Sequence, residues 1–330
     1  MPDLIGHLNS SMKILVTGAA GFIGSKLAWS LARRGDDVVG IDNFNDYYDV
    51  RLKQARVKEF GLSVQTMDIA DKPALDALFA AEKFDKVVNL AAQAGVRYSI
   101  TNSYAYLQSN LVGFLNILEA CRHFDVKHLV YASSSSVYGL NAAVPFQENG
   151  QTDKPVSLYA ATKKSDELMA HAYCKLYGIA MTGLRYFTVY GPWGRPDMSP
   201  MLFASAISRG EPIRVFNNGD MLRDFTYIDD IVEGTIRCID REPEPDENGL
   251  PYRVYNIGCG HPVKLMDFIS ELEQAMGHEA QKVFLPMQPG DVYQTHADTT
   301  LLEREVGYKP QVQLHEGIRR FVEWFKSDLT

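Results

Sequence analysis

The sequence lacks the features that would indicate a secreted, membrane-spanning or metal-binding protein. It has only four cysteines, none in a CxxC pair or beside a histidine at ligand spacing, so neither a disulfide framework nor a metal site is predicted. We expect Cys121, Cys174, Cys238 and Cys259 to be buried, reduced thiols of a cytoplasmic protein. No run of about 18 apolar residues occurs, so no membrane-spanning helix is predicted.

An excess of basic residues is also missing. Lys and Arg number 33 against 41 Asp and Glu, and the net charge of −8 argues against nucleic acid or a membrane surface as the main partner. The first residues have neither the basic start nor the apolar core of a secretory signal, so we expect 1–11 to form a disordered leader, with Met12 as the alternative start. The 330 residues, 46% of them hydrophobic, can form a core larger than that of one typical domain.

Apolar strands alternate with amphipathic helices in the first part of the chain. We expect strands at 13–17, 37–42, 63–69, 86–92, 126–134 and 179–187, and helices at 22–35, 49–60, 72–81, 103–122 and 158–178. This alternation predicts an α/β fold, a doubly wound parallel sheet of the Rossmann type over 12–187. Beyond it, Pro- and Gly-rich turns separate shorter elements. They predict a smaller mixed α/β region over 188–330, placed at the carboxyl ends of the strands, with some segments returning to the sheet.

A glycine-rich turn connects the first expected strand to the first expected helix. Gly18, Gly21 and Gly24 have GxxGxxG spacing. Glycines at these positions allow a tight turn, close approach of backbone N–H groups to a pyrophosphate, and packing of helix on strand. Asp42 ends the second strand, where a carboxylate accepts hydrogen bonds from a ribose diol and repels a 2′-phosphate. The turn therefore predicts an NAD site, and a purely structural turn is the alternative.

Tyr159 and Lys163 lie four residues apart, on one face of the same expected helix. A phenol with an ordinary pKa of about 10 is a poor base at neutral pH, and a cation one helical turn away favours its ionised form. A tyrosine and a lysine at this spacing are common on helix surfaces. Here the pair follows the glycine-rich turn and the serine-rich strand end at 133–136, which favours a catalytic role.

The GxxGxxG turn and the downstream YxxxK motif together resemble the extended branch of the short-chain dehydrogenase/reductase superfamily, over essentially the whole chain from Met12. The resemblance implies that Ser134 hydrogen-bonds the reacting hydroxyl as the third catalytic residue, and that Tyr159 and Lys163 also contact the nicotinamide side of the cofactor. It implies further cofactor contacts from Phe22 and Ile23 along the pyrophosphate, Asp42 and Asn43 at the adenosine ribose, Asp68 and Ile69 beside the adenine, and Leu90, Ala91 and Ala92 at the nicotinamide.

The residues after Ser134 bear on the type of reaction. Sugar-nucleotide 4,6-dehydratases, which resemble this segment, carry Asp-Glu where this chain has Ser135 and Ser136, and decarboxylases carry Glu at the second position. Elimination and decarboxylation need a proton donor beyond the tyrosine, and hydroxyls are feeble acids. We therefore expect an isomerase that moves only a hydride and one proton, namely an epimerase.

Segments 42–49, 91–99, 185–198 and 288–292 resemble UDP-glucuronate 4-epimerases, including Thr188, where galactose-type epimerases carry Asn. The resemblance implies that Phe216 stacks on uracil and that Arg223 and Asp291 contact the nucleotide. Because the guanidinium fork suits a carboxylate, Arg195 is the leading candidate for the sugar carboxylate and Arg97 the second. For each of them a salt bridge within the protein is the alternative. The hydroxyls of Ser134, Ser135, Ser136 and Thr188 are expected around the sugar.

Other functions remain open at this point. The nearest alternative is a UDP-glucose or UDP-N-acetylglucosamine 4-epimerase, followed by a UDP-glucuronate decarboxylase, a net dehydrogenase, and a non-catalytic NAD-sensing protein. The resemblance also implies a role in carbohydrate metabolism and polysaccharide biosynthesis, and a homodimer held by the helices near 103–122 and 158–178. Burial of both helices against the sheet is the alternative to that dimer.

Overall fold

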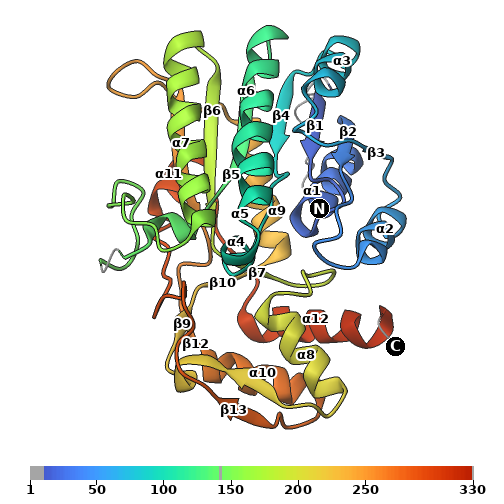
Figure 1. The fold of residues 1–330 in the computed structure, drawn as a ribbon, viewed down its shortest axis with the longest axis vertical. Coiled ribbons are helices and arrows are strands. Elements are labelled where there is room, and N and C mark those ends of the chain that lie inside the picture. Colours follow the sequence, from blue (N-terminus) through green and yellow to red (C-terminus); the bar gives the residue numbers. More distant parts are fainter. Residues whose placement is uncertain (1–10, 141–142, 329–330) are drawn as a thin grey trace, which may run out of the picture.

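A seven-stranded parallel sheet forms the upper part of the molecule (Figure 1). The computed structural model describes residues 11–140 and 143–328, so the predicted leader lies outside them except for Ser11. The strands are β1 (Lys13–Thr17), β2 (Asp37–Asp42), β3 (Val64–Thr66), β4 (Lys86–Asn89), β5 (His128–Ser134), β6 (Ala180–Tyr186) and β11 (Tyr252–Ile257).

The strand order is β11-β6-β5-β4-β1-β2-β3, and all neighbouring strands are parallel. The order reverses between β1 and β4, where an open α/β sheet leaves a crevice at its carboxyl edge. Residues of β1 alternate between the two cores: Ile14 and Val16 belong to one buried cluster and Leu15 to the other. Such burial on both faces is typical of a doubly wound sheet, and it confirms the predicted fold class.

Helices cover both faces of the sheet. Those that pack together on one face are α3 (Lys72–Glu82), α6 (Gly113–His123) and α7 (Leu158–Tyr177). The other face carries α1 (Phe22–Arg33), α9 (Ile228–Asp240) and α11 (Thr300–Val306), and α2 (Val50–Glu59) packs beside α1. Ser157 caps α7 through a hydrogen bond from the Ala160 N–H, and Gly178 ends it in the left-handed conformation that glycine favours.

Three elements, one helix and two strands, differ in length from the prediction. The single helix expected at 103–122 is divided into α5 (Ser103–Tyr106), a π-helical segment η1 (Leu107–Val112) and α6, after a short α4 (Tyr98–Thr101). Strands β3 and β4 end at Thr66 and Asn89, three residues earlier than expected. The residues that follow them, 67–69 and 90–92, leave the sheet and line a cavity instead.

A smaller region lies below the carboxyl ends of the strands in Figure 1. Its helices are α8 (Ser199–Ser208), α10 (Leu265–Met276) and α12 (Leu314–Asp328). Its strands form three short pairs: β7 (Thr188–Tyr190) with β10 (Phe225–Tyr227), β9 (Leu222–Arg223) with β12 (Val263–Lys264), and β8 (Ile213–Val215) with β13 (Lys282–Phe284). Because β11, α9 and α11 come later in the chain yet pack on the large sheet, the domain division at residue 187 stays a prediction.

The cysteines are all free thiols. Cys121, Cys174 and Cys238 are buried as expected, whereas Cys259 is half-buried because it lies in the loop after β11. Across 11–140 and 143–328, none of the helices is both long enough and apolar enough to span a bilayer.

Candidate functional site

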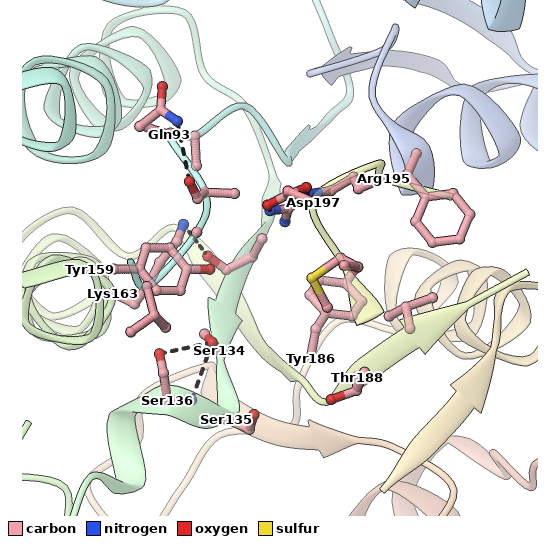
Figure 2. Close-up of a pocket in the computed structure, with 18 of the residues that line it drawn as sticks. Gln93, Ser134, Ser135, Ser136, Tyr159, Lys163, Tyr186, Thr188, Arg195 and Asp197 are labelled. Carbon is pink, nitrogen blue, oxygen red and sulfur yellow. Dashed lines mark hydrogen bonds and ion pairs between the residues drawn. The ribbon is translucent and has the colours of Figure 1, made fainter. Parts of the chain in front are cut away.

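A cavity of about 630 Å³ lies at the carboxyl ends of the strands, and both the sheet and the smaller region contribute to its lining. Every residue that the sequence predicted for the cofactor, the chemistry or the substrate lines this cavity. The topology therefore brings the predicted residues together, while the role of each stays a prediction. Figure 2 shows Tyr159, Lys163, Ser134 and Ser136 on one side of the cavity, with Arg195 and Asp197 across from them.

The glycine-rich turn is shaped by two close backbone approaches. Gly18 has φ +69°, and a Cβ atom there would lie 2.9 Å from the Ala91 nitrogen. A Cβ atom at Gly24 would lie 2.0 Å from the Gly18 carbonyl oxygen, so any side chain would push α1 away from the turn. Gly21 precedes α1 without a side-chain cap, and Phe22 and Ile23, in the first turn of α1, line the cavity. This arrangement fits the pyrophosphate of a dinucleotide at a helix N-terminus.

The end of β2 fits the ribose of the same dinucleotide. Asp42 is almost fully buried, and its carboxylate accepts hydrogen bonds from the Ala20 N–H (3.2 Å) and the Phe44 N–H (2.8 Å). A carboxylate has about four acceptor positions, so Asp42 can still accept hydrogen bonds from a diol. The Asn43 side chain donates to Asp68 at 3.1 Å and so joins the loops after β2 and β3. The residues present are therefore suited to NAD.

The Tyr159 and Lys163 pair lies at the start of α7, next to the end of β5. The Lys163 ammonium is buried and donates a 2.8 Å hydrogen bond to the carbonyl of Ala132, two residues before Ser134. The ammonium is thereby fixed at the strand end, and its second contact, to Asp166 Oδ2 at 3.5 Å, leaves one of its three donor positions for another partner.

Ser134 ends β5 and is followed by a short 3₁₀ turn, η2 (Ser135–Tyr138). Its hydroxyl oxygen accepts hydrogen bonds from the Ser136 N–H (3.2 Å) and from the Ser136 hydroxyl (2.9 Å), as Figure 2 shows. Because both contacts use the Ser134 oxygen as acceptor, its own proton is available to a ligand in the cavity.

The sequence reasoning missed Asn110, which lies in the π-helical segment η1. Its amide accepts from the Gln93 N–H (2.8 Å) and donates to the Gln93 carbonyl (3.1 Å) and the Thr162 hydroxyl (3.0 Å). Thr162 in turn donates to the Tyr159 carbonyl at 2.8 Å. Asn110 thus connects the loop after β4 to the first turn of α7. Because the same segment also carries Gln108, Ser109 and Asn116, nothing in the sequence distinguished Asn110 from them.

Arg195 is held by two residues that were also missed, Asp197 and Tyr47. The guanidinium donates to Asp197 at 3.1 and 2.5 Å, and the Tyr47 hydroxyl donates to the same carboxylate at 2.9 Å. Although burial opposes its ionisation, Arg195 holds the pKa of Asp197 below its ordinary value. Burial and the Asp197 charge raise the pKa of Tyr47 to about 12, so Tyr47 keeps its proton. Arg195 therefore projects into the cavity as one member of a rigid, charged group.

Phe216, Arg97, Arg223 and Asp291 form a second group of contacts in the lining of the cavity. The Arg97 guanidinium lies 5.3 Å from the centre of the Phe216 ring and 3.8 Å from Asp291, which is also 3.9 Å from Arg223. Arg223 donates to the carbonyls of Val292 and Tyr293 and so fixes the loop that carries Asp291. Arg97 therefore lies with the predicted nucleotide contacts.

Comparison with known proteins agrees with this geometry. The model of the NAD dependent epimerase/dehydratase family matches residues 14–258. UDP-glucuronate 4-epimerase 4 of Arabidopsis thaliana is 47% identical, over 97% of this chain and 76% of its own length. The structure of UDP-glucuronic acid 4-epimerase from Bacillus cereus, in complex with UDP-glucuronic acid and NAD, has a TM-score of 0.87 at 36% identity and covers 96% of this chain and 99% of its own. The UDP-glucose 4-epimerase of Thermotoga maritima, solved with UDP-glucose, also has a TM-score of 0.87, at 30% identity over 97% of this chain and 100% of its own.

A buried carboxyl beside Lys163 gives a prediction about pH. Asp166 is 2% exposed, its Oδ2 lies 3.5 Å from the Lys163 ammonium, and its Oδ1 has no hydrogen-bond partner among the described residues. Burial raises the pKa of Asp166 to about 7, against the opposing effect of Lys163. Since the unfolded chain releases this proton near pH 4, the folded state binds more protons between the two pKa values, and its stability falls as the pH rises through that window.

Asp166→Asn has nearly the same shape and no titrating proton. We expect the free energy of unfolding of this variant, relative to the original protein, to rise by on the order of 2 kcal/mol between about pH 5 and pH 8. Urea unfolding at several pH values measures it, with Asp267→Asn, an exposed carboxylate on α10, as the control for loss of charge alone. A difference that stays constant across the window would contradict the prediction.

Proposed function

Because the chain belongs to the NAD dependent epimerase/dehydratase family, we propose that it is a UDP-glucuronate 4-epimerase, an isomerase that interconverts UDP-glucuronate and UDP-galacturonate through a 4-keto intermediate. One observation carries this proposal. Hydroxyls from Ser134, Ser135, Ser136 and Thr188 line the same part of the cavity as Tyr159 and Arg195 (Figure 2), and no carboxyl group occupies positions 135 and 136.

In the proposed mechanism, three residues of the chain handle the proton of the C4 hydroxyl while the cofactor handles the hydride. When bound, NAD accepts a hydride from C4 of the sugar and later returns it, so no cofactor is consumed. Tyr159 takes the proton of the C4 hydroxyl and gives it back, and Lys163 stabilises the ionised phenol from one turn along α7. Ser134 donates its free hydroxyl proton to the same substrate oxygen. Inversion follows when the keto sugar turns its other face toward the cofactor before C4 is reduced again.

This turning motion requires firm anchoring of the nucleotide and weak contacts with the sugar ring. Phe216, Arg223 and Asp291 lie at one end of the cavity and supply the anchor, through ring stacking and charge-assisted hydrogen bonds. Around the sugar the chain offers small hydroxyls, whose hydrogen bonds are weaker and can be exchanged as the ring moves.

We assign the sugar carboxylate to Arg195, because Arg97 lies beside Phe216 and Asp291 at the nucleotide end. A 4-keto uronate is a β-keto acid and readily loses CO2. An arginine that holds the carboxylate, with a serine instead of a glutamate at position 136, suppresses this side reaction. Asp197 keeps the Arg195 guanidinium oriented toward the cavity before the substrate arrives.

The first test is product analysis by NMR. With UDP-glucuronate, we expect UDP-galacturonate to accumulate and deuterium placed at C4 to stay on that carbon, because the hydride never exchanges with water. Tyr159→Phe removes the group that moves the proton and should slow the reaction by at least about 100-fold. Loss of the deuterium to water, or full activity of the tyrosine variant, would contradict the mechanism. Epimerisation of UDP-glucose or UDP-N-acetylglucosamine alone would favour the alternative substrates.

A second prediction concerns loss of CO2. Ser136→Glu introduces the acid that decarboxylases carry, and Arg195→Ala releases the sugar carboxylate. Each change should raise the share of UDP-pentose among the products severalfold, measured by NMR or by CO2 release. Ser135→Ala, a change at the neighbouring hydroxyl that adds no acid, is the control. If both variants give the same share of UDP-pentose as the original protein, the proposed role of Ser136 and Arg195 is wrong.

We also propose that the protein is a homodimer that uses the α5, η1, α6 and α7 surface. Leu107, Leu168 and Leu176 are exposed there, and Tyr104 is 81% exposed, whereas Phe114 and Leu118 face the sheet core. Exposed apolar side chains in such number on neighbouring helices are typical of an interface. The predicted cytoplasmic location and role in polysaccharide biosynthesis stay predictions.

Sedimentation at micromolar concentration should give twice the mass of the chain. Leu168→Glu places a charge on this surface, at an exposed leucine of α7, and should produce a monomer. Phe284→Glu, at an exposed apolar residue in the smaller region, should leave the dimer intact. A monomeric original protein would overturn the proposal.

A further inference from the structure

Arg56 on α2 is completely buried, although it is charged and forms no salt bridge with any carboxylate of the described residues. Its guanidinium donates four hydrogen bonds, to the carbonyls of Trp193 (3.0 Å), Ala20 (3.2 Å) and Gly194 (3.3 Å) and to the Tyr48 hydroxyl (2.7 Å). All four acceptors are neutral. Burial lowers the pKa of Arg56, against the smaller opposing effects of Tyr48 and of the Asp42 charge, because a charge that contacts no carboxylate is costly in the interior. Because burying this charge is costly, we expect its role to lie in the segments that Arg56 connects.

The first element that Arg56 joins is the glycine-rich turn. Ala20 lies between Gly18 and Gly21, and its N–H group donates to Asp42, the predicted ribose ligand. Its carbonyl accepts from Arg56. The peptide groups of this turn are therefore held from one side by the ribose carboxylate and from the other by the buried guanidinium.

The second element is the loop at 191–198, which carries Arg195. Trp193 has φ +64°, the left-handed region that strains a side chain of this size. Two contacts stabilise this conformation: its carbonyl accepts from Arg56, and its ring lies 5.2 Å from that of Trp324 on α12. Arg56 also holds the carbonyl of Gly194, the residue directly before Arg195. The Arg56 side chain thus holds the backbone of the two residues that precede Arg195.

A second route from Arg56 reaches the Arg195 side chain. The guanidinium lies 5.5 Å from the centre of the Tyr48 ring and donates to its hydroxyl. The neighbouring Tyr47 donates to Asp197, which holds the guanidinium of Arg195. Both the backbone and the side chain of Arg195 are therefore linked to Arg56.

We propose that Arg56 is a positioning residue that sets the specificity for a sugar carboxylate by coupling the NAD-binding turn to the Arg195 loop. The inference rests on the proposed function and names a determinant of it outside the cavity. An arginine suits this place because its planar fork presents five donors over a wider span than the compact ammonium of a lysine, which has three. Since coupling between two sites is reciprocal, ordering of the turn by the dinucleotide strengthens carboxylate binding, and the reverse also holds.

The test measures binding as well as turnover. In the NAD-loaded protein, Arg56→Lys keeps the charge and loses the fork. We expect calorimetry to show an approximately tenfold weaker affinity for UDP-glucuronate, the effect of misplacing one charge-assisted hydrogen bond, and an affinity for UDP within about twofold of the original. The NAD content of the purified variant should also fall. The control is Arg51→Lys, a side chain 88% exposed on the same helix, which should change none of these.

A double-mutant cycle with Arg195→Ala separates positioning from general stabilisation. If Arg56 acts through Arg195, adding Arg56→Lys to the Arg195→Ala protein weakens UDP-glucuronate binding little further. An equal loss in both backgrounds, or a loss for UDP as large as that for UDP-glucuronate, would overturn the inference.

Tyr48→Phe keeps the guanidinium and removes one of its acceptors, so it serves if the lysine variant does not fold. It should weaken UDP-glucuronate binding by about two- to threefold without affecting UDP, and no change would count against the inference. A protein that binds UDP-glucuronate without epimerising it would overturn the proposed function, while the binding cycle would still decide the role of Arg56.

Discussion

The site depends on one buried ion pair, between Arg185 on β6 and Glu167 on α7. The two side chains meet at 2.7 and 2.9 Å, and each is 3% exposed. Glu167 also accepts from Ser133 at 2.7 Å, and Arg185 also donates to Tyr138 at 3.0 Å. The attraction within a buried pair offsets its loss of hydration only when the remaining donors and acceptors are also hydrogen-bonded. These extra contacts therefore stabilise the pair in the interior. They also fix the helix of Tyr159 and Lys163 to the strand end of Ser134.

Three more charges at the site follow the same logic with different partners: Lys163 and Arg56 are buried, and Arg195 is partly exposed. Lys163 lies beside Asp166 and a backbone carbonyl, Arg195 lies against Asp197, and Arg56 has only neutral oxygens around it. Each charge lies where two segments distant in the sequence must be held at a fixed separation. In a low-dielectric interior such contacts are stronger than on the surface and costly to leave incomplete, so they define one arrangement of the loops around the cavity.

The sequence was sufficient for residues whose place follows from topology. In a parallel sheet all carboxyl ends meet at one edge, so Gly18 after β1, Asp42 at the end of β2 and Ser134 at the end of β5 had to lie close together. The partners of Arg195 and Arg56 could not be predicted in this way. Tyr47 and Asp197 are 150 positions apart, and Arg56 and Trp193 are 137 apart. No periodicity or motif encodes which loops of two regions come into contact.

The π-helical turn at Asn110 was missed for a related reason. Local propensity favours a continuous helix over 103–122, and the extra residue in the turn is stabilised only by tertiary contacts to Gln93 and Thr162. The position of Arg97 was likewise not predictable from the sequence. Its residue type suits a carboxylate anywhere, and only the fold places it beside Phe216 instead of near Arg195.

The shared fold also limits where substrate specificity can reside. Structures of a UDP-glucuronic acid and a UDP-glucose 4-epimerase match this chain with the same TM-score of 0.87, so the sheet and the helices on it do not distinguish the two sugars. The distinction must come from side chains and loops outside the sheet. In this chain the loop at 191–198 brings the Arg195 cation to the cavity, and its conformation includes a left-handed tryptophan. Under the proposed function, the contacts that Arg56 makes beneath this loop therefore bear on specificity together with the Arg195 cation.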